Sequence, residues 1–225
     1  MKYTYYGHSC FSLEIKGKKL LFDPFISANG LAKDINPDTV EADYILVSHG
    51  HADHVADLVS IAKRTGALVI CAWEIYQWLE SQGVSNVHPM NTGGKKQFDF
   101  GTVKCVVAQH SSSLPDGTYA GNPMGFIIMS DKNVYYSGDT ALTLDMQLAP
   151  QGAPISVCIF PIGDNFTMGY EDAARAAHFV QCSTVIGVHF NTFPYIEIDT
   201  VKAKDHFSKN GLTLVLPHIG ETISL

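Results

Sequence analysis

The stretch Ser48-His49-Gly50-His51-Ala52-Asp53-His54 places three histidines and one aspartate within six residues, directly after the apolar run Tyr44-Ile45-Leu46-Val47. An apolar run of this length predicts a buried strand. Imidazole and carboxylate groups are costly to crowd together unless a cation compensates them. The stretch therefore predicts a metal centre at the end of a buried strand.

The spacing of these ligands indicates how one stretch can serve two metal ions. His49 and His51 are two residues apart, so both point to one side of an extended segment. Asp53 and His54 follow where the chain turns into a predicted helix over Val55–Arg64, so they can face a second point in space. Strand ends at one edge of a sheet are where ligands usually converge. Further candidate ligands directly follow predicted strands, namely His110, Asp139 and His189.

Length and composition predict one globular domain over residues 1–225, with two small domains as the alternative. Hydrophobic residues make up 46% of the chain and charged residues 16%, which fits a substantial core. A net charge of -7 argues against general affinity for nucleic acid or anionic membranes. The five cysteines form no Cys-x-x-Cys pair, and no secretory or membrane-spanning apolar segment is visible. We expect buried, reduced thiols in a cytoplasmic protein.

Short strands and helices alternate along the chain. The predicted strands are Tyr3–Tyr6, Cys10–Ile15, Leu20–Phe22, Tyr44–Val47, Ala67–Cys71, Val103–Ala108, Phe126–Met129, Val134–Tyr136, Ile155–Phe160, Thr184–Val188 and Thr213–Leu216. The predicted helices are Val55–Arg64, Trp73–Ser81, Glu171–Gln181 and Thr200–Ser208. A β-meander followed by alternating strands and helices, twice over, predicts an α/β (α+β) protein of two packed sheets with outer helices, a four-layer αββα sandwich.

The full ligand pattern resembles that of the metallo-β-lactamase superfamily. The superfamily signature His-x-His-x-Asp-His is complete in the opening stretch, and the later ligand positions are matched in order by His110, by Asp139 in Ser137-Gly138-Asp139-Thr140, and by His189. The resemblance spans essentially the whole chain. Three further motifs resemble the ascorbate-6-phosphate-lactonase-like branch of small metal-dependent hydrolases: Gly7-His8-Ser9, Leu21-Phe22-Asp23-Pro24 and His189-Phe190-Asn191-Thr192-Phe193-Pro194.

The resemblance implies a metallo-β-lactamase fold with two divalent metal ions. It assigns the first metal to His49, His51 and His110, the second to Asp53, His54 and His189, and a bridging role to Asp139. A donor set of histidine and aspartate admits zinc, which we expect first, and also manganese and iron. Paired metals of this kind sit ~3.5–4 Å apart and lower the pKa of bound water toward ~7.

Other residues are predicted to act around the metals. Asp53 would orient the attacking hydroxide, and His8 would give a proton to the leaving group or bind substrate, with a structural histidine as the alternative. Asp23, which ends a strand, is predicted to orient a ligand histidine rather than to bind metal. Asn165, Asn191 and Tyr195 are predicted to line the substrate pocket, with a packing role as the alternative.

These residues predict a metal-dependent hydrolase acting on a small-molecule ester, lactone or phosphoester. A phosphodiesterase or nuclease of the same fold is the alternative, but the extra domain or basic arm usual in such nucleases is not visible. Iron-dependent dioxygenase or flavodiiron chemistry is a third option, although the flavodiiron pattern has glutamate where this chain has His51. A binding protein that has lost catalysis is disfavoured because all seven ligands are present. A homo-oligomer is compatible with the sequence.

Overall fold

The computed structural model describes residues 1–150 and 154–225. Contacts within the chain divide it into two compact units. Unit 1 consists of Met1–Asn91, Ser111–Pro123 and Pro217–Leu225, and unit 2 of Thr92–His110 and Met124–Leu216. Within the described residues, each unit is built around its own seven-stranded sheet.

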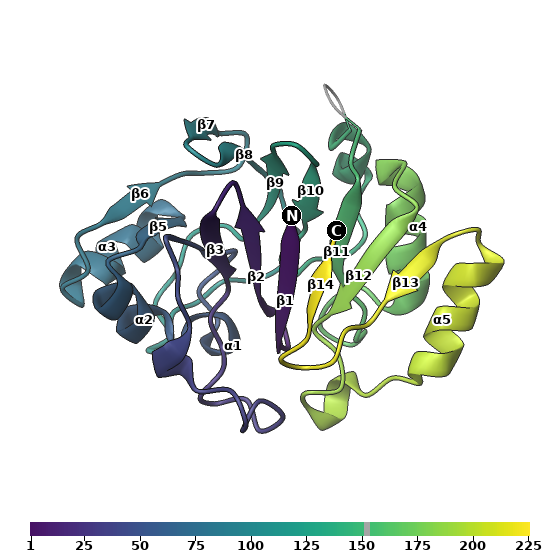
Figure 1. The fold of residues 1–225 in the computed structure, drawn as a ribbon, viewed down its shortest axis with the longest axis horizontal. Coiled ribbons are helices and arrows are strands. Elements are labelled where there is room, and N and C mark those ends of the chain that lie inside the picture. The colour runs from purple at the N-terminus through teal and green to yellow at the C-terminus, as the bar shows by residue number, and fades with distance from the viewer. Residues whose placement is uncertain (151–153) are drawn as a thin grey trace. The chain divides into compact units, whose positions relative to one another are not determined.

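The sheet of unit 1 combines antiparallel and parallel strands in the order β14-β1-β2-β3-β4-β5-β6. Its strands are β1 (Lys2–Gly7), β2 (Cys10–Ile15), β3 (Lys18–Phe22), β4 (Tyr44–Leu46), β5 (Leu68–Cys71), β6 (Val87–Pro89) and β14 (Thr222–Ser224). Pairing is antiparallel from β14 to β3 and parallel from β3 to β6. The first and last strands of the chain therefore lie side by side (Figure 1).

The helices of unit 1 depart from the sequence prediction at one point. They are η1 (Pro37–Thr39), α1 (Ala52–Val55), α2 (Leu58–Thr65) and α3 (Trp73–Ser81). The predicted continuous helix over Val55–Arg64 is wrong at its start, because the helix is interrupted between α1 and α2. At the break, the backbone N–H of Asp57 donates to the Pro24 carbonyl at 3.0 Å. The buried Asp57 carboxylate accepts from the N–H groups of Ile26 and Ser27 at 2.6 and 2.9 Å, so a long-range contact replaces the helical one.

The sheet of unit 2 has the order β13-β12-β11-β10-β9-β8-β7. Its strands are β7 (Lys95–Phe98), β8 (Gly101–Val107), β9 (Met124–Met129), β10 (Val134–Tyr136), β11 (Val157–Pro161), β12 (Thr184–Val188) and β13 (Thr213–Val215). Pairing is parallel from β10 to β13, which brings the carboxyl ends of these strands to one edge of the sheet.

Helices pack against the parallel half of this sheet. They are η2 (Leu144–Leu148), α4 (Tyr170–Val180), η3 (Pro194–Ile196) and α5 (Thr200–Lys209). The small alanine side chains of α4 join Phe160 of β11 and Phe207 of α5 in one buried cluster. Figure 1 shows α4 and α5 in green and yellow beside β11, β12 and β13. The alanine face predicted from the sequence is thus the face that the helix buries.

The strands that the sequence did not predict are β6, β7 and β14, and all three lie at sheet edges. An edge strand needs only one hydrogen-bonded neighbour and buries little side-chain area, so its residues need no apolar run. The sequence of β7, Lys-Lys-Gln-Phe, illustrates this. The predicted α/β class, with two mixed sheets and helices, is confirmed.

Two further expectations concern the thiols and the helices. All five cysteines lie within the described ranges and are buried thiols, as the sequence predicted. Burial raises the pKa of Cys105 to about 12, so this thiol stays protonated and is a poor nucleophile. Across residues 1–150 and 154–225, every helix is too short or too polar to cross a membrane.

The packing of β11 gives a stability prediction. Phe160 is fully buried and its ring meets that of Tyr135 edge-on, with centroids 5.4 Å apart. Phe160→Ala should lower the free energy of unfolding by about 3–5 kcal/mol, measured by urea denaturation, because it leaves a cavity in the cluster. Val201→Ala on the exposed face of α5 is the matched control and should change it by less than about 0.5 kcal/mol. A Phe160→Ala loss no larger than that of the control would contradict this packing.

Candidate metal centre

The first part of the candidate site lies at the ends of β3 and β4 in unit 1. These strands are parallel neighbours, so their carboxyl ends meet at one edge. Asp23 directly follows β3, and the opening histidine stretch follows β4. His51 is the N-cap of the short helix α1, which carries Asp53 and His54. The turn into α1 therefore separates the first two histidines of the stretch from the next two ligands, as predicted.

A buried carboxylate organises this part of the site. Asp23 is fully buried, and its Oδ1 accepts from the backbone N–H of Ser48 at 2.7 Å. Its Oδ2 accepts from the hydroxyl of Ser48 at 2.5 Å and lies 2.8 Å from Nδ1 of His54. Because a carboxylate only accepts, these contacts direct the Ser48 hydroxyl proton and a proton on His54 Nδ1 toward Asp23.

The same contacts fix which ring nitrogen of each histidine keeps its lone pair. Since the Ser48 proton points at Asp23, the Ser48 oxygen can accept from Nδ1 of His49, which is 3.0 Å away. His49 and His54 then both carry their proton on Nδ1 and present the lone pair of Nε2. A neutral imidazole with one nitrogen donating to an oxygen is the usual form of a metal-binding histidine. Side-chain N and O atoms of Asp23, His49 and His54 lie within 4.8 Å of one another, and in this group Asp23 accepts hydrogen bonds from Ser48 and His54.

The donor set fits a cation between His49 and His51. Nε2 of His49 lies 2.9 Å from Nδ1 of His51, and the two rings meet at an interplanar angle of 78°. Two nitrogen lone pairs at this distance repel each other unless a proton or a metal ion lies between them. Imidazole nitrogen is a ligand shared by zinc, iron and related metals. The chemistry of the residues present therefore fits the metal that the sequence predicts.

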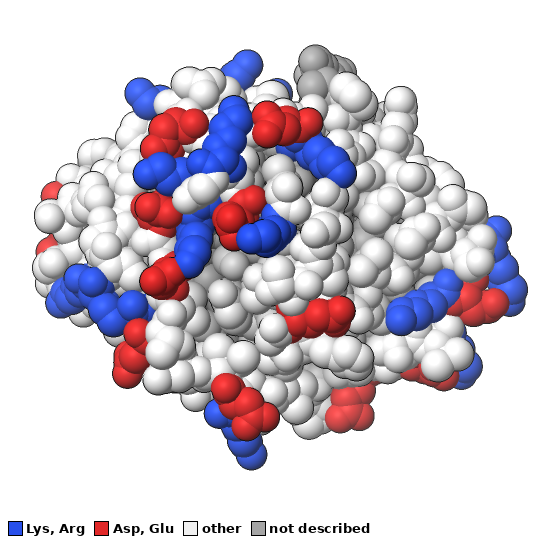
Figure 2. Space-filling view, in the orientation of Figure 1, with Lys and Arg blue, Asp and Glu red and all other residues white. Residues whose placement is uncertain are grey.

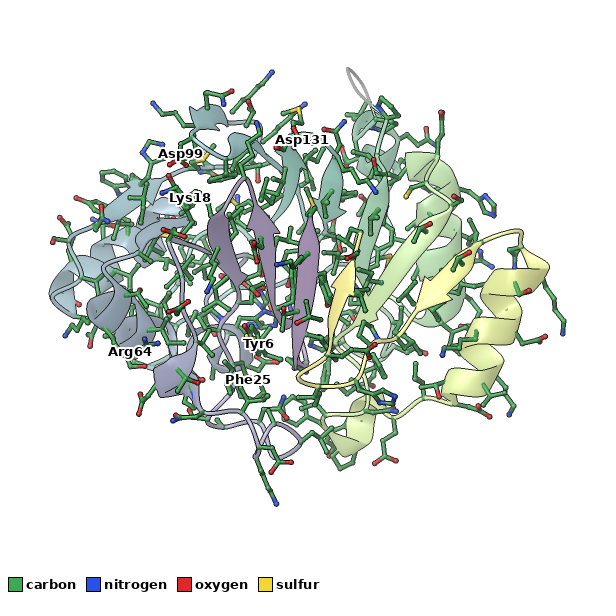
Figure 3. All side chains as sticks on the ribbon, viewed as in Figure 1. Tyr6, Lys18, Phe25, Arg64, Asp99 and Asp131 are labelled. Carbon is green, nitrogen blue, oxygen red and sulfur yellow. The ribbon has the colours of Figure 1, made fainter. Side chains whose placement is uncertain are left out.

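Asp53 and His8, the two predicted catalytic residues, lie side by side in unit 1. Oδ2 of Asp53 is 3.0 Å from Nε2 of His8 and 3.9 Å from Nε2 of His54. His8 is buried, and its carbonyl accepts from the Tyr5 hydroxyl at 3.0 Å. Its ring meets Phe25 edge-on with centroids 5.3 Å apart, and Figure 3 labels Phe25 beyond the end of β3. These contacts fix His8 against the carboxylate.

The remaining predicted ligands come together within unit 2. His110 follows β8, Asp139 follows β10 and His189 follows β12. Oδ2 of Asp139 lies 3.0 Å from Nε2 of His189 and 3.8 Å from Nε2 of His110. Asp139 and His189 are buried, whereas His110 is partly exposed. One oxygen of Asp139 thus lies near a ring nitrogen of each histidine.

The backbone is unusual at predicted site residues in each unit. Eight non-glycine residues among those described have a positive φ, and five of them are predicted site residues: His8, Asp23, Asn165, His189 and Asn191. Non-glycine residues adopt this left-handed region rarely, and those that do cluster at functional sites. The backbone is therefore strained at five of the predicted site residues.

The predicted substrate-binding residues divide into two groups. Asn165 and Tyr195 line a cavity of about 570 Å³ in unit 2, and Tyr195 is 75% exposed. Asn191 instead uses its side-chain oxygen to accept from the backbone N–H of Ile198 at 2.8 Å. The structure thus brings Asn165 and Tyr195 to one cavity, while the side chain of Asn191 holds its own loop.

Several residues around the ligands were missed by the sequence prediction. Ser48 belongs to the opening stretch, but its role depends on Asp23, which lies 25 residues away along the chain. Tyr5 and Phe25 act through contacts with His8. The Ser111 hydroxyl lies 3.4 Å from Nε2 of His51, and the sequence signal at this position is the Ser-, Gly- and Pro-rich loop Ser111–Asn122, which does not single out Ser111. These roles arise from contacts between distant segments and carry no local pattern.

Comparison with known proteins identifies the family. Residues 2–189 match the Beta-lactamase superfamily domain. The chain belongs to this superfamily. It is 50% identical over 226 residues to a "UPF0173 metal-dependent hydrolase" of Methylacidiphilum infernorum and 46% identical over 231 residues to YtkL of Bacillus subtilis, another protein of that description. Each alignment covers 100% of both chains.

Solved structures agree with this assignment. The metallo hydrolase Igni18 of Ignicoccus hospitalis superimposes with a TM-score of 0.88 at 34% identity, over 99% of this chain and 97% of that one. An isothiocyanate hydrolase from Delia radicum gut bacteria shares the fold, with a TM-score of 0.80 at 20% identity over 100% of this chain and 99% of that one. The predicted superfamily and fold are confirmed, and the protein is a metal-dependent hydrolase.

The contacts of Asp23 give a metal-binding prediction. Asp23→Asn keeps the shape of the side chain but replaces one acceptor oxygen with a donor, so one of the groups that now donate to it loses its acceptor. We expect zinc affinity to fall about 10–100-fold, measured by competition with a chromophoric chelator.

The matched control is Asp57→Asn, which changes another buried carboxylate that accepts backbone N–H groups. It should lower stability but leave zinc affinity unchanged. Equal loss of zinc affinity in both variants would mean that Asp23 acts only through general stability.

Proposed function

We propose that the protein hydrolyses a small-molecule ester, lactone or phosphoester at a dinuclear metal centre. The observation that carries the proposal is the set of hydrogen bonds that links His49 to Ser48, and Ser48 and His54 to Asp23. These bonds hold the ring proton on Nδ1 of both histidines, so that Nε2 of each can bind a metal ion. Two divalent ions bound there would supply an activated water nucleophile at neutral pH and a Lewis acid for the substrate oxygen.

The proposed ligand assignment follows the superfamily pattern. One metal is assigned to His49, His51 and His110, the other to Asp53, His54 and His189, with Asp139 bridging. The short contacts between His49 and His51, and between Asp139 and His189, support the assignment within each unit. Because the set contains no thiolate, zinc, manganese and iron all remain compatible, and we propose zinc as the first ion to test.

Asp53 and His8 are proposed to handle the protons of the reaction. Asp53 is 27% exposed, so a carboxylate oxygen can reach a water at the mouth of the site. It would orient that water for attack and accept its proton. His8 shares a hydrogen bond with the same carboxylate oxygen at 3.0 Å, and it would donate a proton to the leaving group or bind the substrate.

The substrate is proposed to be a small molecule in the cytoplasm. Asn165 and Tyr195 line a cavity of about 570 Å³ in unit 2, but none of the predicted metal ligands is among its lining residues, so the cavity by itself does not locate the substrate. On the face drawn in Figure 2, Lys and Arg side chains alternate with Asp and Glu rather than forming a basic stripe. With the net charge of -7, this disfavours nucleic acid as substrate. Five buried thiols fit a reducing compartment.

A substrate screen tests the proposed function. The purified protein is analysed for bound metal, reconstituted with zinc or manganese, and assayed on lactones, phosphodiesters and thioesters. Metal-dependent turnover of a small ester or lactone is the expected result. A protein with no bound metal and no metal-dependent turnover would overturn the proposal, and activity on RNA alone would favour the nuclease alternative.

The role of Asp53 has its own test. Asp53→Asn should reduce kcat by about 10²–10⁴-fold, because the amide accepts no proton from the attacking water. Circular dichroism should show an unchanged fold. Asp205→Asn, at an exposed ion pair on α5, is the matched control and should keep full activity. Near-normal kcat in the Asp53→Asn variant would refute the role of this carboxylate.

A further inference from the structure

We propose that Ser111 is a positioning residue that holds His51 in its metal-binding orientation. The proposal rests on the dinuclear centre of the proposed function and adds a residue that the ligand pattern does not contain. It starts from a regularity among the histidines of unit 1. His49 has the Ser48 oxygen on its Nδ1, and His54 has an Asp23 oxygen on its Nδ1. In both rings, the nitrogen that faces away from the proposed metal donates to an oxygen.

In His51 the two ring nitrogens have the opposite roles from those in His49 and His54. Its Nδ1 lies 2.9 Å from Nε2 of His49, so Nδ1 is the nitrogen that faces the proposed metal. Its Nε2 lies 3.4 Å from the hydroxyl oxygen of Ser111. For Nδ1 to offer a lone pair, the ring proton must sit on Nε2, where Ser111 can accept it. Ser111 thus occupies for His51 the place that Ser48 and Asp23 occupy for the other two histidines.

His51 needs this contact more than the other histidines do. His49 and His54 are buried, so packing restricts their rings, whereas His51 is partly exposed. A partly exposed imidazole can rotate about its Cβ–Cγ bond and present a carbon where the metal needs Nδ1. An acceptor on Nε2 disfavours that rotation, because the rotated ring loses its hydrogen bond. Such outer contacts typically change metal affinity 10–100-fold.

The segment that carries Ser111 packs against the stretch Ser48–His54. The next residue, Ser112, accepts through its hydroxyl oxygen from the backbone N–H of Gly50 at 3.2 Å. A side chain at position 50 would collide with Cβ of Ala120 and would lie 3.1 Å from the Ser113 carbonyl oxygen. Only glycine permits this close approach. The loop therefore rests directly on the backbone that precedes His51.

The loop is also closed on itself. Ser113 and Tyr119 form an antiparallel bridge, and Leu114 donates to the Thr118 carbonyl at 2.8 Å. A closed loop held at both ends delivers Ser111 to a defined position, although Ser111 itself is exposed. The geometry therefore gives the loop after His110 a role in preparing the metal site, separate from any contact with substrate.

The test compares zinc binding by Ser111→Ala, Ser111→Thr and the unchanged protein, using competition with a chromophoric chelator. Ser111→Ala should weaken zinc binding at one site about tenfold. Ser111→Thr should restore most of the affinity, because it returns the hydroxyl. With cobalt as the probe, the visible spectrum of Ser111→Ala should differ from that of the unchanged protein, which a general loss of stability would not produce.

Ser85→Ala is the matched control, since it removes the hydroxyl of another exposed serine of unit 1, and it should bind zinc normally. Unchanged zinc affinity and cobalt spectrum in Ser111→Ala would overturn the proposal, as would a loss that Ser111→Thr fails to restore. Because the readout is metal binding, the result is independent of hydrolysis. If zinc affinity falls in Ser111→Ala and returns in Ser111→Thr, but the unchanged protein hydrolyses none of the substrates, the proposed function is refuted and the role of Ser111 is supported.

Discussion

The buried carboxylate of Asp23 is the contact on which the unit 1 part of the site depends. A carboxylate removed from water is costly unless hydrogen bonds replace its hydration, and here the backbone and hydroxyl of Ser48 and the ring of His54 supply them. The hydroxyl proton of Ser48 and the Nδ1 proton of His54 therefore point toward Asp23, and the Nδ1 proton of His49 points toward Ser48. As a result, His49 and His54 both carry their ring proton on Nδ1 and their lone pair on Nε2 before any metal binds.

The candidate ligands could be recognised in the sequence because their types and their positions near strand ends are both local signals. His110, Asp139 and His189 lie within three residues of the ends of β8, β10 and β12, and the structure brings them together within unit 2. The break at Asp57 and the contact between Ser111 and His51 could not be predicted in the same way. The contact at the break joins residues 30 positions apart, and the contact between Ser111 and His51 joins residues 60 positions apart. The sequence around each of these residues contains no local pattern that predicts its partner.

The strain in the backbone and the chemistry of the ligands point to the same residues. Asp23 and His189 both leave the ends of parallel strands in the left-handed region, where a non-glycine residue is disfavoured. A fold selected for stability alone would place glycine at such positions. At these two positions the protein has instead a carboxylate that can orient a ligand histidine and an imidazole that can bind a metal ion, and both are functions that a metal-dependent hydrolase requires.

The most direct test of this account is anomalous X-ray scattering from crystals grown with zinc, recorded on both sides of the zinc absorption edge. The account predicts two anomalous peaks per chain, one bound by His49, His51 and His110 and the other by Asp53, His54 and His189, at nitrogen distances of about 2.0–2.1 Å, with Asp139 touching both. A single peak, or a peak bound directly by Asp23, would contradict it.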